Sequence, residues 1–178
     1  MGKVKECDIL LFPPSNWIGR IIAWSTDRAF CHVAVCVSKQ LGLMVEAQAG
    51  LVRSIKLSDL PANYALFRVR KEYPYEAYGV ISYLLKSLNA RYDYTGVLYL
   101  GLLKVLAKVG FNTRGMANRL QKDKDYFCSE LCYLAFLEGG GLDIVPEVPS
   151  GDIVSPGDIA RSSVLKTLLL KYSDAGMV

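Results

Sequence analysis

The stretch Ala29–Val37, with the sequence AFCHVAVCV, decides the fold because it is dense in apolar and β-branched residues and long enough for a buried strand. A turn around Gly42 follows, and Leu43–Ala47 reads as its antiparallel partner. Three further strands are expected on the same grounds: Asp8–Phe12, Leu51–Ile55 and Ala65–Arg70. The sequence therefore predicts a mainly antiparallel sheet.

Helices are expected where apolar residues recur at helical spacing. The predicted segments are a short helix at Trp17–Trp24 and longer ones at Tyr75–Leu88, Thr95–Val109 and Tyr126–Glu138, the last stopped by three glycines from Gly139 to Gly141. Beyond them, Pro146 to Asp158 reads as a long connection with little regular structure, and a brief helical turn is expected at Leu57–Pro61. The pattern leaves open whether Val164–Tyr172 is a strand or a helix. The predicted class is α+β, with the sheet packed against helices.

Composition places the chain among globular proteins. It has 178 residues, 52% of them hydrophobic and 21% charged, which fits one domain covering residues 1–178. The net charge is +4, and the basic residues are scattered rather than gathered in a dense block. We therefore expect a solvated surface and no nucleic-acid partner.

The five cysteines are odd in number and include no C-x-x-C pair, so reduced thiols are expected. With one histidine in the chain, few ligands are available for a cysteine–histidine metal cluster. We therefore expect no metal and no cofactor. The first residues are charged and lead directly into a strand, without the apolar core of a signal peptide. The longest apolar stretch, Val97–Leu103, is too short to span a bilayer. The expected location is the cytoplasm.

Cys128 lies in the segment DYFCSEL, Asp125–Leu131. With Asp125 as the helix N-cap, Cys128 is the third helical position, where unpaired backbone N–H groups and the helix dipole favour a thiolate. The same N–H groups are placed to hold an oxyanion. The alternative is a small buried apolar thiol, since cysteine is among the most buried residue types.

A thiolate nucleophile needs a base, and His32 is the only histidine available. Glu46 lies on the neighbouring strand, where hairpin pairing can bring both side chains to one face and let the carboxylate orient the imidazole. The alternatives are a histidine at a strand end with its hydrogen bonds satisfied, and an edge-strand glutamate pointing to water.

Three other cysteines compete for the nucleophile role. Cys31 neighbours His32 along a strand, where successive side chains point to opposite faces, and Cys36 sits two pleats away. Cys132 lies one turn deeper in the helix than Cys128, beyond the terminal N–H groups. A separate candidate pair, Tyr92 and Tyr94, is suited to orienting substrate, with aromatic packing as the alternative.

The motifs Cys31–Val35, Val45–Ala47, Tyr92-Asp93 and Tyr126–Leu131 together resemble the circularly permuted papain-like amidases, the YiiX and YebB-like branch of the NlpC superfamily. The resemblance covers about Asp8 to Asp158. Its strength lies in the order of histidine, glutamate and cysteine, which reverses the cysteine-first order of unpermuted papain-like enzymes.

The resemblance implies a papain-like, circularly permuted fold and a cysteine hydrolase of amide bonds, often in cell-wall peptides. It implies Cys128 as nucleophile, His32 as base, Glu46 as the orienting acid and Tyr92 as a substrate-side residue. The substrate expected is a small peptide or amide. Lipid-acting relatives, which usually have a second histidine where Glu46 stands, offer a thiol acyltransferase or lipid hydrolase as an alternative. A binding module that keeps the fold without turnover is the other alternative.

Overall fold

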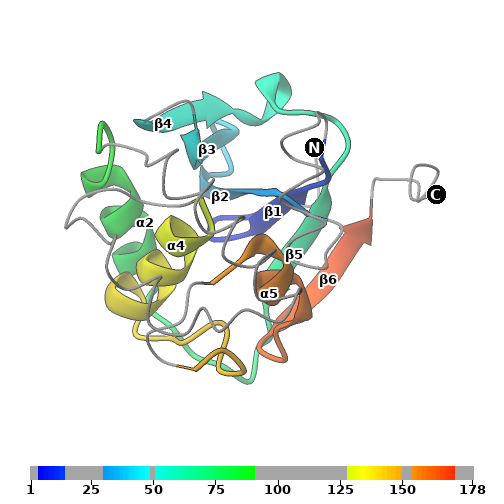
Figure 1. Ribbon diagram of the computed structural model, residues 1–178. Helices are drawn as coiled ribbons and strands as arrows, with labels where there is room; N and C mark the ends of the chain where they lie inside the picture. Colours follow the sequence, from blue (N-terminus) through cyan, green and yellow to red (C-terminus); the bar gives the residue numbers. More distant parts are fainter. Residues whose placement is uncertain (1–3, 15–29, 49–50, 91–127, 150–153, 171–178) are drawn as a thin grey trace, which may run out of the picture.

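The structure is a computed structural model that describes residues 4–14, 30–48, 51–90, 128–149 and 154–170. Six strands form one sheet in the order β4-β3-β2-β1-β5-β6, with every neighbouring pair antiparallel. Their bounds are β1 Ile9–Phe12, β2 His32–Ser38, β3 Leu43–Gln48, β4 Leu51–Lys56, β5 Ala65–Val69 and β6 Leu165–Leu170. The predicted antiparallel sheet and α+β class are confirmed (Figure 1).

The described helices lie mainly on one side of this sheet (Figure 1). They are α2 Ala77–Lys86, α4 Cys128–Leu134, its π-helical continuation η3 Ala135–Gly139, and α5 Pro156–Arg161; a 3₁₀ turn, η1, spans Leu57–Asp59. The helices predicted at Tyr75–Leu88 and Tyr126–Glu138 are thus confirmed in their described parts, and η1 matches the brief helical turn predicted at Leu57–Pro61.

Residue alternation along β2 divides the core in two. Val33, Val35 and Val37 join the helix-side cluster, whereas Ala34 and Cys36 belong to a cluster on the opposite face. Both kinds of residue are buried because helices cover one face of the strand, and the chain around η1 contributes Leu60 and Tyr64 to the other. A continuous apolar run, rather than simple alternation, is what such a doubly covered strand requires.

Glycines let the α4–η3 unit approach α2 closely. A Cβ added to Gly79 would lie 1.9 Å from the carbonyl oxygen of Gly139, and one added to Gly139 would lie 2.6 Å from the carbonyl oxygen of Gly79. Gly141 adopts a φ of 68°, a left-handed conformation that favours glycine after a helix. The three glycines therefore end the helix, as predicted, and the first also allows close packing.

The expectation of little regular structure up to Asp158 is wrong at its end, where α5 begins. Ser155 caps this helix: its Oγ accepts a hydrogen bond from the backbone N–H of Asp158, and the Asp158 carboxylate accepts from the backbone N–H of Ser155. Pro156 occupies the first turn, where its missing N–H costs nothing. Ser-Pro-Gly-Asp is therefore a helix start here rather than a loop.

The segment left open at Val164–Tyr172 contains a strand, β6, which pairs with β5. This pairing joins residues about a hundred positions apart, so local pattern had no means of choosing between strand and helix.

One basic residue expected at the solvated surface, Arg68, is instead half-buried. The Arg68 guanidinium donates two hydrogen bonds, of 2.5 and 2.7 Å, to the carboxylate of Asp8, which is fully buried. Asp8 precedes β1 and Arg68 lies on β5, so this ion pair holds together two paired strands far apart in sequence.

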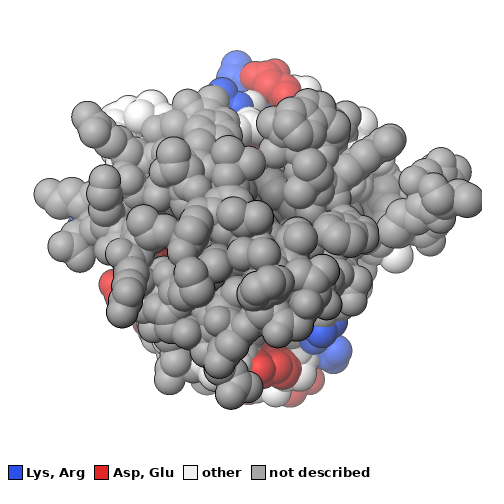
Figure 2. Space-filling model, in the orientation of Figure 1, with Lys and Arg blue, Asp and Glu red and all other residues white. Residues whose placement is uncertain are grey.

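In Figure 2, described acidic and basic side chains are visible at the edge of the view, and they adjoin one another at its top and bottom. None of the helices in the described part of the chain is long and apolar enough to span a membrane. The helices predicted at Trp17–Trp24 and Thr95–Val109 lie outside the described residues.

Candidate active site

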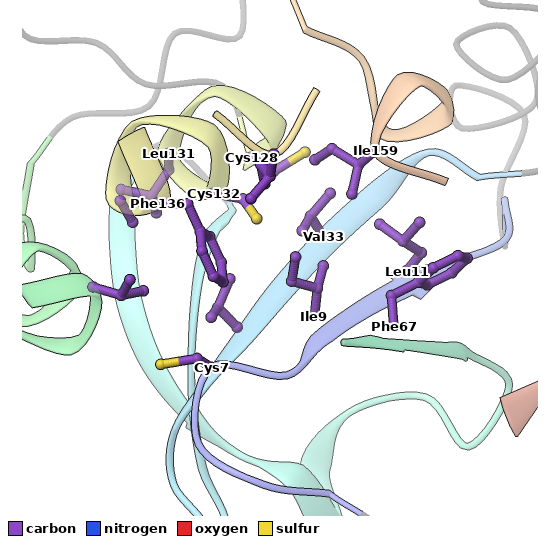
Figure 3. Packing of buried hydrophobic residues seen from close by; sticks show 14 of the residues in the cluster. Cys7, Ile9, Leu11, Val33, Phe67, Cys128, Leu131, Cys132, Phe136 and Ile159 are labelled. Atoms are coloured by element: carbon purple, nitrogen blue, oxygen red, sulfur yellow. The ribbon is translucent and has the colours of Figure 1, made fainter. Parts of the chain in front are cut away.

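Cys128 is the first described residue of α4, which packs over β2 and β3. The residue is 7% exposed, and its sulfur points toward Ile159 of α5, in the same core cluster as Val33 of β2 (Figure 3). The next residue anchors this end of the helix, because the buried Ser129 hydroxyl donates a 2.7 Å hydrogen bond to the carbonyl oxygen of Val154. The thiol is thus placed by the sheet, by α4 and by the segment leading into α5. Asp125, the expected N-cap, lies outside the described residues.

His32 opens β2, and its imidazole contacts Glu46 of β3. Because Ala34 pairs with Glu46, His32 is the diagonal neighbour of that carboxylate across the antiparallel pair. The Nε2–Oε2 distance is 2.8 Å. An ionised carboxylate only accepts hydrogen bonds, so Nε2 carries the proton and Nδ1 is the nitrogen left to face Cys128.

The protonation of His32 reflects its neighbours on both sides. Burial opposes the imidazolium and by itself lowers the pKa, but hydrogen bonding and charge interactions with Cys128 and Glu46 outweigh burial and raise the pKa of His32 to about 9. The imidazolium form is therefore favoured at neutral pH, and it is the form that pairs with a thiolate.

Glu46 is 1% exposed and has two cationic partners. Burial alone raises its pKa, but hydrogen bonds and charge interactions with His32 and Arg53 hold the pKa of Glu46 below its ordinary value. The alternative of an edge-strand glutamate pointing to water is therefore wrong. The carboxylate is an ionised, buried group that remains charged because its partners surround it.

The other four thiols differ from Cys128 in their surroundings. Burial raises the pKa of Cys7 to about 11 and those of Cys31 and Cys36 to about 12, and it raises that of Cys132 as well. Cys36 belongs to the core cluster on the face of the sheet opposite α4. These four thiols are protonated at neutral pH.

The structure therefore brings Cys128, His32 and Glu46 together from a helix and two adjacent strands. Tyr92 and Tyr94, the candidate substrate-binding residues, lie outside the described residues. Sequence reasoning missed Arg53, which donates two hydrogen bonds to Glu46. The register of the β3–β4 pair was the feature that could have revealed this contact, because it places Arg53 directly opposite Glu46.

No protein-family model matches the chain, and no curated protein matches it. Among solved structures, it is similar to the crystal structure of metalloprotein yiiX from Escherichia coli O157:H7, DUF1105. The TM-score is 0.67 at 15% sequence identity, over 95% of this chain and 98% of that chain. At this identity the match shows the fold alone, and it supports the expected YiiX-like fold.

The neighbour is called a metalloprotein. In the ranges described for this chain, no three His, Cys, Asp or Glu side chains are grouped so as to hold a metal ion.

Proposed function

We propose that this protein is a cysteine hydrolase that cleaves an amide bond, in a peptide or cell-wall-type peptide, through Cys128, His32 and Glu46. The observation that carries the proposal is the division of the imidazole between two partners: Nε2 is bonded to a buried carboxylate, which leaves Nδ1 for the thiol. A nucleophile, its base and an orienting acid in this relation are what acyl transfer by cysteine requires.

In the proposed reaction, His32 holds the proton of the Cys128 thiol on Nδ1, and the sulfur attacks the substrate carbonyl carbon as a thiolate. The resulting tetrahedral species collapses as the carbon–nitrogen bond breaks, and His32 protonates the departing amine nitrogen. Water then attacks the thioester while His32 takes its proton, and the released acid leaves the thiol free. Glu46 holds the imidazole throughout and stabilises its positive charge.

The order of the three residues supports a circularly permuted papain-like arrangement. His32 and Glu46 come from the first half of the chain and Cys128 from the second, on a helix packed against the strands that carry the other two. The fold similarity to yiiX is consistent with this assignment.

The test is hydrolysis of a peptide-amide panel that includes cell-wall-type peptides, with acylated lipids screened beside them. We expect Cys128→Ala to abolish turnover while leaving the circular dichroism spectrum unchanged. Cys36→Ala is the matched control, since it removes a thiol from the opposite face of the sheet. Full amidase activity in Cys128→Ala would exclude the assignment, and transfer of a lipid acyl group instead of amide hydrolysis would favour the lipid-acting alternative.

A further inference from the structure

Arg53 lies on β4 directly opposite Glu46 on β3. Its Nε and Nη2 both donate hydrogen bonds to Glu46 Oε1, at 2.9 and 2.7 Å. His32 Nε2 bonds to the other oxygen, Oε2, at 2.8 Å. The two oxygens of the carboxylate are thus divided between the arginine and the histidine.

The guanidinium is itself held in place from β3. Its Nη2 also donates a 2.7 Å hydrogen bond to the side-chain oxygen of Gln48, two residues beyond Glu46. The Arg53 side chain is 42% exposed, whereas that of Glu46 is fully buried. Arg53 therefore reaches from the protein surface to the buried carboxylate, with both of its partners on one strand.

This arrangement has two physical consequences for His32. Because Arg53 occupies Oε1 with a planar fork, the carboxylate cannot rotate freely, and Oε2 stays directed at the imidazole. Because the guanidinium is always charged, it also offsets part of the negative charge that stabilises the imidazolium. Among the described residues, the titratable groups in contact with this pair are Cys128 on the histidine side and Arg53 on the glutamate side.

We propose that Arg53 is a positioning residue that fixes the Glu46 carboxylate for His32 and limits the basicity of the imidazole. The catalytic consequence rests on the proposed hydrolase function, whereas the effect on His32 does not. An imidazole that is too basic holds its proton and is a poor donor to the leaving amine, so the arginine favours proton transfer in both directions.

The first test is an NMR titration of His32, the single histidine of the chain, whose ring signals need no further assignment. We expect Arg53→Met to raise the pKa of His32 by roughly half a unit or more, because a nearby positive charge is lost. Arg53→Lys keeps the charge and should leave this pKa near that of the unmodified protein. Lys56→Met removes a positive charge from the same strand without touching Glu46 and should not change it.

The double variant Glu46→Gln/Arg53→Met separates a direct effect from an indirect one. Once Glu46 is neutral, removal of Arg53 should change the pKa of His32 less than it does in the unmodified protein. If Arg53→Met does not fold, the pKa of His32 is compared in Arg53→Gln instead, because this variant retains an amide donor for Glu46. An unchanged pKa of His32 in a folded variant at position 53 would overturn the proposal.

The second test is the division between kcat and KM. Because Arg53 is placed behind Glu46, Arg53→Met should lower kcat at least about tenfold with little change in KM, and Arg53→Lys should recover part of the loss. A folded Arg53→Met with unchanged kcat would refute the positioning role. If the unmodified protein hydrolyses none of the amides, the proposed function fails, while the titration still decides whether Arg53 controls His32.

Discussion

At the residue scale, the candidate site depends on a buried ionised carboxylate between two cations. Glu46 stays charged because His32 and Arg53 each bind one of its oxygens, and His32 gains a proton because it lies between Glu46 and Cys128. Each of these charges would be costly to bury alone. The local pairing therefore links protonation of the site to the stability of the fold.

The pH dependence of stability follows from the raised pKa of His32. Its ordinary value is 6.5 and its value in the folded protein is about 9, so the stabilisation is fully present below about pH 6.5 and is lost as pH rises through about 9. We expect the difference in unfolding free energy between the unmodified protein and His32→Gln to shrink by up to about 3 kcal/mol across this window. Urea unfolding at a series of pH values measures it, and a difference independent of pH would contradict the expected linkage.

We also expect a thiol reagent to label Cys128 selectively. The other four thiols, three of them buried and Cys31 partly buried, have raised pKa values and should react slowly with iodoacetamide at neutral pH, whereas Cys128 adjoins a protonated imidazole. Peptide mapping should find one label per chain, at Cys128, and His32→Ala should abolish the preference. Equal labelling of Cys128 and Cys31 would instead support the binding-module alternative.

At the element scale, α4 and η3 are held against α2 by backbone contact between glycines. This contact holds in place the helix that carries Cys128. It acts on the side of α4 that faces α2, away from α5 (Figure 1). The π-helical turn η3 follows α4 directly and ends at Gly139, where the backbones of η3 and α2 approach each other.

Replacement of Gly79 tests this packing. Helix propensity alone predicts that Gly79→Ala stabilises α2 by about 1 kcal/mol. The added Cβ would lie 1.9 Å from a backbone oxygen of Gly139, so we expect destabilisation by about 2–4 kcal/mol instead. Urea unfolding measures the change, with Ser82→Ala on the same helix as the control. A more stable Gly79→Ala variant would show that α2 and η3 can separate without cost.

At the scale of the whole molecule, the sheet joins segments from both ends of the described chain. β1 is an inner strand of the sheet and pairs with both β2 and β5. β5 in turn pairs with β6. The Asp8–Arg68 ion pair spans the β1–β5 junction and buries its carboxylate fully.

Removal of Arg68 should therefore weaken the entire fold. Arg68→Met leaves Asp8 as a buried carboxylate without its guanidinium, and we expect a loss of about 3–5 kcal/mol in unfolding free energy at neutral pH. Arg161→Met, which removes a more exposed ion pair on α5, should cost less than about 1 kcal/mol by the same measurement.

Sequence pattern alone determined the local elements and the candidate residues. The apolar runs of β2 and β3 and the helical spacing after Cys128 are properties of neighbouring residues, and a single histidine leaves one choice of imidazole. Only tertiary structure decided that Leu165–Leu170 is a strand, that Arg68 binds the buried Asp8 and that Arg53 binds Glu46. These outcomes depend on strand register and on the burial of charge, and both arise from contacts between segments that local sequence does not specify.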